Sequence, residues 1–287
     1  MASSATPLPT LLTLHGSGSS SLIHTIQLAR LTRLLKPHFN LHHLTAPYPC
    51  AAGPGVLPFF EGCGPYYRWL PSTYLNITSE QMKAGTSNIE MPPEVEELIK
   101  GAVEEVKGKG GKVVGLVGFS QGTRVSAGLM MGRELLFGES ASAASSSSSS
   151  SDEEVQGLKA KYGWLQDFHF FLSVCGSFPP PLVPAGLVPL LPSSSSSSSS
   201  SDPASTSTSS KPAPFTYPKI TAPTLHVLGT HDEWTWAGKL LIDACFEVEQ
   251  GKSEVLTLDI GHHYPVKPED SEKIANWAKE AYEMTSA

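Results

Sequence analysis

The chain has 287 residues, of which 40% are hydrophobic and 16% charged, and its formal net charge is −7. This length allows one large α/β domain or two small ones. The acidic balance, without a stripe rich in lysine and arginine, argues against a nucleic-acid-binding surface. No apolar stretch approaches the roughly 20 residues that a membrane-spanning helix needs. Residues 1–9 lack the basic and apolar regions of a secretory signal, so none is expected.

The first predicted elements are a strand, a helix and a second strand. Residues 10–14 form a short apolar strand that ends in the glycine-rich turn 15–18. Apolar residues at helical spacing predict a helix over residues 22–35, which Pro37 stops. Residues 39–44 follow as a strand.

Residues 46–93 form a long segment that is rich in proline, glycine and aromatic residues. A segment of this length in a compact domain is usually functional or disordered, and its aromatic content argues against disorder. We predict a loop that covers the functional site, with an ordinary aromatic-packed surface loop as the alternative. A helix is predicted over residues 93–107, because Pro93 and an acidic first turn favour a helix start.

The most specific pattern lies at residues 113–122, where the sequence is VVGLVGFSQG. An apolar, β-branched run ends in Gly-x-Ser-x-Gly, and a helical pattern follows to about residue 136. This is the form of a nucleophile elbow, in which a sharp turn exposes a serine at the carboxyl edge of a sheet. Gly118 and Gly122 leave room for the strand and the helix to pass closely. The pattern predicts Ser120 as a nucleophile, and a structural turn is the alternative.

The second half of the chain continues the alternation of strands and helices. Strands are predicted at residues 168–176, 224–229 and 254–259, and helices at residues 234–246 and 268–284. Two serine-rich stretches, at residues 139–154 and 193–211, are predicted to be disordered surface insertions because they offer little apolar surface to bury. Strands that are apolar on both faces predict a mostly parallel central sheet with helices on both faces. We expect a single domain over residues 1–287.

A serine hydroxyl needs a base to take its proton, and that base is usually a histidine oriented by a carboxylate. In α/β folds with this elbow, the chain order is serine, acid, histidine. Asp232 follows a predicted strand in LGTHD, and His262 follows the last predicted strand in GHHYP. We assign Asp232 as the orienting acid and His262 as the base. Asp259 and His263 remain alternatives for these two roles.

An oxyanion that forms during attack also needs hydrogen-bond donors. The backbone N–H of Gln121 directly follows the nucleophile at a helix start and is the natural first donor. The second donor is expected from the turn after the first strand, where we choose the N–H of Ser17, with Gly16 as the alternative. Aromatic residues of the covering segment are expected to wall a substrate pocket. These are Phe59, Phe60, Tyr66, Tyr67 and Trp69.

Several motifs together resemble the FSH family of serine hydrolases, a fungal and animal branch of the α/β-hydrolases. They are LTLHG (12–16), APYP (46–49), GPGVLPFF (53–60), GFSQG (118–122), LGTHD (228–232) and GHHYP (261–265). GHHYP is similar to the family's Gly-His-x-x-Pro and supports His262, whereas LGTHD is similar to its Gly-x-x-Asp and supports Asp232. Ser17 departs from the bulky residue that the family often carries there. The serine expansions look fungal.

The resemblance implies an α/β-hydrolase fold and hydrolysis of esters or thioesters through an acyl-enzyme, without metal or cofactor. The substrate would be a small-molecule ester or an acyl thioester, free or presented on a carrier protein; some fungal members resemble factors that release a polyketide acid. The alternatives are acyl transfer, dienelactone-type ring opening and a non-catalytic binding module. The four cysteines match neither a zinc site nor a redox pair. Free thiols fit a reducing compartment, so we expect a cytoplasmic protein, with the nucleus as the alternative.

Overall fold

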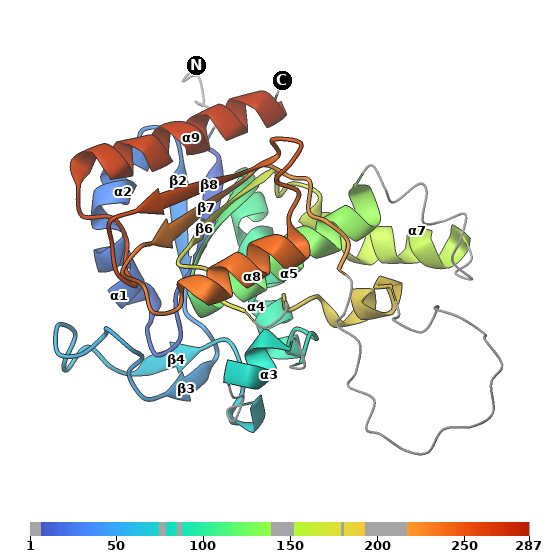
Figure 1. Ribbon diagram of the computed structural model, residues 1–287. Coiled ribbons are helices and arrows are strands. Elements are labelled where there is room, and N and C mark those ends of the chain that lie inside the picture. Colours follow the sequence, from blue (N-terminus) through green and yellow to red (C-terminus); the bar gives the residue numbers. More distant parts are fainter. Residues whose placement is uncertain are drawn as a thin grey trace, which may run out of the picture.

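In a computed structural model, residues 7–74, 79–84, 88–138, 152–178, 181–192 and 217–286 are described. The predicted insertion at 193–211 and most of the one at 139–154 lie outside these residues. The strands of the main sheet are β1 (Thr10–Leu14), β2 (Asn40–Leu44), β5 (Val113–Phe119), β6 (Phe170–Val174), β7 (Thr224–Gly229) and β8 (Ser253–Leu258). All pair in parallel, in the order β2-β1-β5-β6-β7-β8 (Figure 1).

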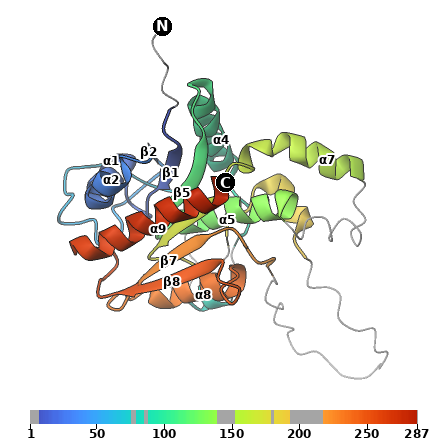
Figure 2. The same ribbon diagram turned by 90° about the horizontal axis from the view of Figure 1, so that it is seen from above.

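Helices cover both faces of this sheet (Figures 1 and 2). One face packs against α1 (Ser21–Gln27), α2 (Ala29–Leu35) and α9 (Pro268–Ser286). The other packs against α4 (Pro93–Gly108), α5 (Gln121–Phe137) and α8 (Thr235–Cys245). The predicted α/β architecture, a parallel sheet between two helical layers, is confirmed.

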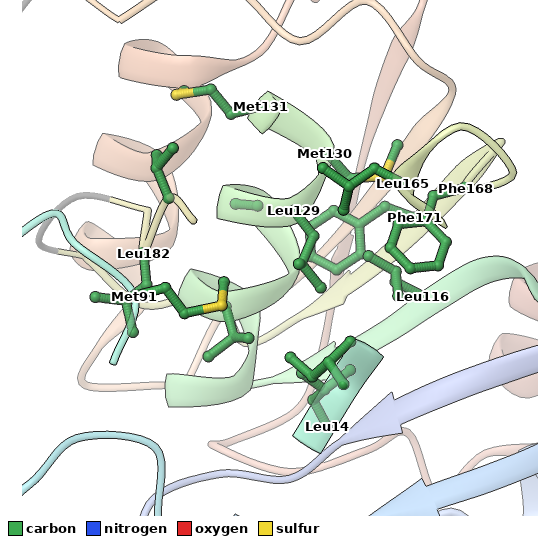
Figure 3. Close-up of a cluster of buried hydrophobic side chains, with 14 of the residues drawn as sticks. Leu14, Met91, Leu116, Leu129, Met130, Met131, Leu165, Phe168, Phe171 and Leu182 are labelled. Atoms are coloured by element: carbon green, nitrogen blue, oxygen red, sulfur yellow. The ribbon is translucent and has the colours of Figure 1, made fainter. Parts of the chain in front are cut away.

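The two cores explain why the strands are apolar along their whole length. Successive residues of a strand point to opposite faces, and both faces are covered. In β6, the fully buried Phe170 and Leu172 belong to the α2 and α9 side, whereas Phe171 belongs to the α5 side. In Figure 3, Leu129 and Met130 of α5 lie in the same cluster as Phe171. The central helix α5 is therefore held on several sides by apolar contacts.

The structure differs from the sequence prediction in three places. The helix expected over residues 22–35 is divided into α1 and α2 at Leu28, whose side chain is fully buried, so the apolar pattern continues across the break. The segment 46–93 is not irregular throughout, because β3 (Tyr48–Cys50) and β4 (Tyr66–Arg68) form an antiparallel pair and α3 covers Ser79–Lys83. The helix α7 (Asp152–Lys161) starts within the predicted insertion 139–154. The C-terminal end of the predicted insertion is therefore wrong, because residues 152–154 are helical.

Short 3₁₀ helices occur at Ser72–Tyr74, Gly163–Leu165 and Ala185–Leu190. Within the described ranges, no helix has both the length and the apolar character that crossing a bilayer would require.

Three histidines that were not predicted to be buried lie in the core: His15, His24 and His226. Burial lowers the pKa of His15 to about 4 and that of His226 to about 3. Burial, with a smaller effect of the neighbouring histidines, also lowers the pKa of His24 well below 6.5. Since an unfolded histidine has a pKa near 6.5, the unfolded chain binds more protons than the folded one between that pH and the folded pKa. Stability must fall as the solution is acidified through this window.

Replacing His226 with phenylalanine should therefore reduce the loss of stability in acid. Its ring packs edge-on against Phe246, with centroids 4.4 Å apart, so a phenyl ring suits the site. Between pH 7 and pH 5, one such histidine costs about 2 kcal/mol of unfolding free energy. Urea unfolding at pH 7 and at pH 5 should show that the unfolding free energy of His226→Phe falls by about 2 kcal/mol less than that of wild type. The exposed His38, changed to glutamine, serves as the control. An equal loss in His226→Phe and wild type would contradict the expectation.

Candidate active site

Ser120 occupies the sharp turn between β5 and α5. Its backbone has φ 49° and ψ −122°, a left-handed conformation that non-glycine residues rarely adopt. The backbone N–H of Ser120 donates to the Val174 carbonyl of the neighbouring strand at 3.1 Å. The turn is thus tied to the sheet, and the hydroxyl is held at its carboxyl edge. This is the geometry that the Gly-x-Ser-x-Gly pattern predicted for residue 120.

The two glycines of the pattern allow the close approach that the turn needs. A Cβ added at Gly122 would lie 2.3 Å from the Leu14 carbonyl oxygen and 2.8 Å from that of His15. A Cβ at Gly118 would lie 2.9 Å from the Thr123 Cα. At both positions the obstacle includes backbone, which cannot rotate away as a flexible side chain could.

Replacing Gly122 with alanine should lower the free energy of unfolding by about 3 kcal/mol, the cost of overpacking against fixed atoms. Gly101 in α4 is the matched control, because a Cβ added there meets nothing within 4 Å. Gly101→Ala should instead stabilise by about 1 kcal/mol, since alanine favours helix. Urea unfolding of both variants would check this. Equal stabilities would show that β1 and α5 are not in close contact at Gly122.

His262 lies between Ser120 and Asp232. Its Nδ1 is 2.9 Å from Asp232 Oδ2, and its Nε2 is 2.9 Å from Ser120 Oγ. Because an ionised carboxylate only accepts hydrogen bonds, Nδ1 must carry the proton when the imidazole is neutral. Nε2 is then an acceptor for the Ser120 hydroxyl. The ring also packs against Phe119, with centroids 5.2 Å apart. The structure therefore brings together three side chains that are far apart in the sequence.

The Asp232 carboxylate is buried and held from two sides. Its second oxygen, Oδ1, accepts the Trp234 backbone N–H at 2.8 Å. Burial raises the pKa of Asp232, but hydrogen bonds from His262 and from the Trp234 N–H outweigh it, so the pKa lies below its usual 3.8. The group is therefore ionised at neutral pH and orients one tautomer of His262.

The alternative acid and base lie elsewhere. The Asp259 carboxylate is exposed and contacts His231 at 2.9 Å and Lys267 at 3.4 Å. The ring of His263 accepts the Gly261 backbone N–H at Nε2, so it is turned into its own loop. Nδ1 of the same ring lies 2.8 Å from the Tyr264 carbonyl oxygen. Neither Asp259 nor His263 joins the line from Ser120 to Asp232.

In the described part of the chain, one cluster has the spacing of metal ligands: Cys175, Asp232 and His262, whose ligand atoms lie within 4.8 Å of one another. Both ring nitrogens of His262 already contact Ser120 and Asp232. Burial raises the pKa of the Cys175 thiol well above its usual value, so the group is protonated at neutral pH. The sulfur lies 3.8 Å from the carbonyl oxygens of Gly261 and His263, to which the thiol donates.

The two expected oxyanion donors border the same cavity as Ser120. Gln121 is the first residue of α5, so its N–H has no partner within the helix. Ser17 lies in the turn after β1, which His15 stabilises. The His15 Nε2 accepts the Ala46 N–H at 3.0 Å, and Nδ1 donates to the Gly16 carbonyl at 2.6 Å. These contacts stabilise the turn after β1 and join it to the segment that follows β2.

A cavity of about 280 Å³ opens at Ser120, near the lower end of the range for small-molecule sites. The five aromatic residues that we expected to line it do not border it. Phe59 is 86% exposed, and the hydroxyl of Tyr66 is bound to the Phe60 carbonyl. Trp69 is fully buried, and its indole N–H donates a hydrogen bond to the His15 carbonyl at 2.7 Å. Tyr67 pairs with Ser19 through the backbone.

Other residues of the covering segment border the cavity instead: Pro54, Gly55, Val56, Arg68, Leu70 and Met82. Sequence reasoning also missed Arg124, although its place four residues after Ser120 puts it one helical turn along the same face of α5. Gln121 fastens the covering segment to the elbow, because its side-chain oxygen accepts the Trp69 backbone N–H at 2.8 Å.

Comparison with known proteins relates this chain to a family. A family model described as serine hydrolase (FSH1) matches residues 5–274. The chain is 27% identical over 268 residues to esterase FUS5 of Gibberella fujikuroi, covering 93% of this chain and 84% of that protein. It is 34% identical over 127 residues to the dihydromonacolin L-[lovastatin nonaketide synthase] thioesterase of Aspergillus terreus, covering 44% of this chain and 48% of that protein.

The crystal structure of esterase PE8 superposes with a TM-score of 0.50, covering 97% of this chain and 94% of that chain. At 13% sequence identity, this likeness shows a shared fold. Together with the parallel sheet, it confirms the predicted α/β-hydrolase fold. Because the family model spans the chain from the first strand into the last helix, the chain belongs to the serine hydrolase (FSH1) family.

Proposed function

We propose that this protein hydrolyses carboxylic esters or thioesters through an acyl-enzyme on Ser120, with His262 as the base and Asp232 as the orienting acid. The observation that carries the proposal is the unbroken line of hydrogen bonds from Asp232 through His262 to Ser120, with both contacts at 2.9 Å. The strained turn presents the Ser120 hydroxyl to the cavity. A nucleophile, a base and an orienting group in such a line form the arrangement required for acyl transfer.

Each residue has a defined part in the proposed reaction. Ser120 Oγ attacks the acyl carbon while its proton passes to His262 Nε2, and Asp232 stabilises the resulting imidazolium. The backbone N–H groups of Gln121 and Ser17 hold the negative oxygen. The proton on Nε2 then passes to the departing alcohol or thiol. Water attacks the acyl-enzyme by the same proton path and releases the acid.

The names of the relatives support an acyl substrate. One relative is named an esterase and another a dihydromonacolin L-[lovastatin nonaketide synthase] thioesterase. We extend this to a small ester or an acyl thioester, presented free or on a carrier protein. The cavity volume of about 280 Å³ suits a short acyl or aromatic group. All four cysteines are free thiols, which fits a cytoplasmic location.

Covalent labelling by a fluorophosphonate tests the proposal directly. Attack by Ser120 Oγ on phosphorus would expel fluoride and leave a stable adduct, which peptide mass spectrometry assigns to a residue. Hydrolysis of p-nitrophenyl esters and acyl thioesters of graded chain length would then define the substrate. Folded protein that is neither labelled at Ser120 nor active on this panel would overturn the proposal and favour a binding role.

A further inference from the structure

The cavity at Ser120 is positively charged, although the chain carries a formal net charge of −7. Arg68 and Arg124 both border it. Among the described residues that border the cavity there is no aspartate or glutamate. The chemistry proposed above uses neither arginine. Two guanidinium groups beside a reacting serine therefore need another explanation.

Arg68, at the end of β4, is buried, and the residue is only 8% exposed. Solvent does not reach its Nε, which has no hydrogen-bond partner among the described residues. In the described part of the chain, no carboxylate lies within ion-pair distance of Arg68. A buried donor without an acceptor is costly, and a buried cation without a counter-charge more so. Such a group is expected to meet an acceptor that the chain does not supply.

A hydroxyl in the same condition borders the same cavity as Arg68. Ser19 is 3% exposed, borders the cavity, and its Oγ has no hydrogen-bond partner within the described residues. Ser19 pairs with Tyr67, the residue before Arg68, through backbone hydrogen bonds of 2.7 Å and 3.2 Å. The serine hydroxyl and the guanidinium therefore come from adjacent backbone segments. Both groups can donate to one oxygen-rich ligand.

Arg124 adds a second positive charge from α5. Its side chain is 3% exposed, and Nη2 donates to the Asn88 carbonyl at 3.2 Å. Burial lowers the pKa of Arg124 to about 10, which leaves the group protonated at neutral pH. Arg124 borders the same cavity as Ser120, so its charge contributes to the potential inside that cavity.

We propose that the cavity contains an anion subsite, in which Arg68 and Ser19 bind a carboxylate or phosphate of the substrate and Arg124 supplies further positive charge. The inference rests on the function proposed above and narrows the substrate class to esters or thioesters that carry a negative group. Guanidinium groups bind both anions through paired N–H donors, so carboxylate and phosphate share one recognition chemistry. A carboxylate would sit on the acyl chain, and a phosphate on the leaving thiol.

Two pairs of substrates distinguish a negative group on the acyl chain from one on the leaving thiol. The first pair is a p-nitrophenyl ester of a straight-chain acid and the matching ester whose terminal methyl is replaced by carboxylate. The second pair is one acyl group on coenzyme A and on N-acetylcysteamine, which lacks the phosphates. The readout is the ratio of kcat/KM within each pair. This ratio does not depend on the fraction of folded enzyme, because both substrates meet the same molecules.

Arg68→Met keeps the length of the side chain but removes its charge and donors. We expect it to lower the preference for the anionic substrate about 10- to 100-fold, the strength of a charge-assisted hydrogen bond. Arg68→Lys should show a preference for the anionic substrate between those of wild type and Arg68→Met, because lysine keeps the charge but lacks the planar pair of donors. Arg30→Gln, an exposed arginine of α2, is the matched control and should leave the ratios unchanged. The pair whose ratio falls identifies which part of the substrate carries the anion.

Ratios that are equal in wild type and Arg68→Met for both pairs would overturn the subsite while leaving the hydrolase function intact. If no substrate is hydrolysed, the hydrolase function fails, and the subsite is judged by binding. Calorimetric titration of the carboxylate ester, and separately of the acyl coenzyme A thioester, into Ser120→Ala, with and without Arg68→Met, gives this measurement. A Kd for either ligand that Arg68→Met weakens about 10- to 100-fold supports the subsite, and unchanged Kd values for both ligands overturn it.

Discussion

Replacing Ser120 with alanine is expected to abolish ester hydrolysis and fluorophosphonate labelling together. The alanine removes the only atom that the proposed mechanism joins to the acyl group. In serine hydrolases that depend on such a residue, the loss in kcat is on the order of 10⁵- to 10⁶-fold. Initial rates on the most reactive ester of the panel, with enzyme at high concentration, give the range needed to measure this. Residual activity near the uncatalysed rate is the expected result.

The control for this variant is a check that Ser120→Ala still folds. The Ser120 hydroxyl contacts His262, whereas the turn is held by the backbone, including the Ser120 N–H to Val174 hydrogen bond. Alanine keeps that backbone, so circular dichroism and the urea midpoint should stay close to those of wild type. A folded Ser120→Ala protein with more than a few per cent of wild-type activity would show that another residue carries the acyl group.

Replacing Asp232 with asparagine should cost about 10³- to 10⁴-fold in kcat, as the loss of the orienting carboxylate does in serine proteases. The amide nitrogen of asparagine donates a hydrogen bond, so it would favour the tautomer of His262 with a bare Nδ1 and a proton on Nε2. That proton would face the Ser120 hydroxyl, and His262 could no longer accept from it. The effect is one of tautomer and charge, because the two side chains have almost the same shape.

Asp259→Asn is the matched control for this change. Asp259 is the competing acid of the sequence prediction, and its exposed side chain contacts His231 and Lys267 instead of His262. An exposed ion pair contributes little to stability, so this variant should keep kcat within about twofold. The comparison of kcat for the two variants decides the assignment. Near-full activity of Asp232→Asn, or a large loss in Asp259→Asn, would reverse the assigned roles.

Much of the fold follows from local patterns in the sequence. The strand predicted at 224–229 is β7 (Thr224–Gly229), and the helix predicted at 93–107 is α4 (Pro93–Gly108). Strands buried on both faces must be apolar throughout, which identifies them without knowledge of their neighbours. The positions of Ser120, Asp232 and His262 follow in the same way. Each lies in the turn or loop that follows a strand, and parallel strands bring their carboxyl ends to one edge.

The lining of the cavity could not be predicted in this way. Aromatic content suggested that Trp69 faces the substrate, yet its two N–H groups find acceptors at His15 and Gln121, on other elements. Those acceptors are far away in the chain, so no local pattern indicates that the ring is buried. The same holds for Arg68, one residue earlier, which borders the cavity although an arginine on a short strand is usually exposed.

By itself, the sequence determined the parallel α/β sheet and the sharp turn at Ser120, because these depend on periodicity and on turns between neighbouring residues. Only the tertiary structure decided which way the side chains of the covering segment face. Their orientation depends on hydrogen bonds to β1 and α5, such as that from Trp69 to Gln121, and on backbone pairing between Ser19 and Tyr67. Partners of this kind become neighbours only when the chain has folded, and the resulting cavity at Ser120 is bordered by two arginines.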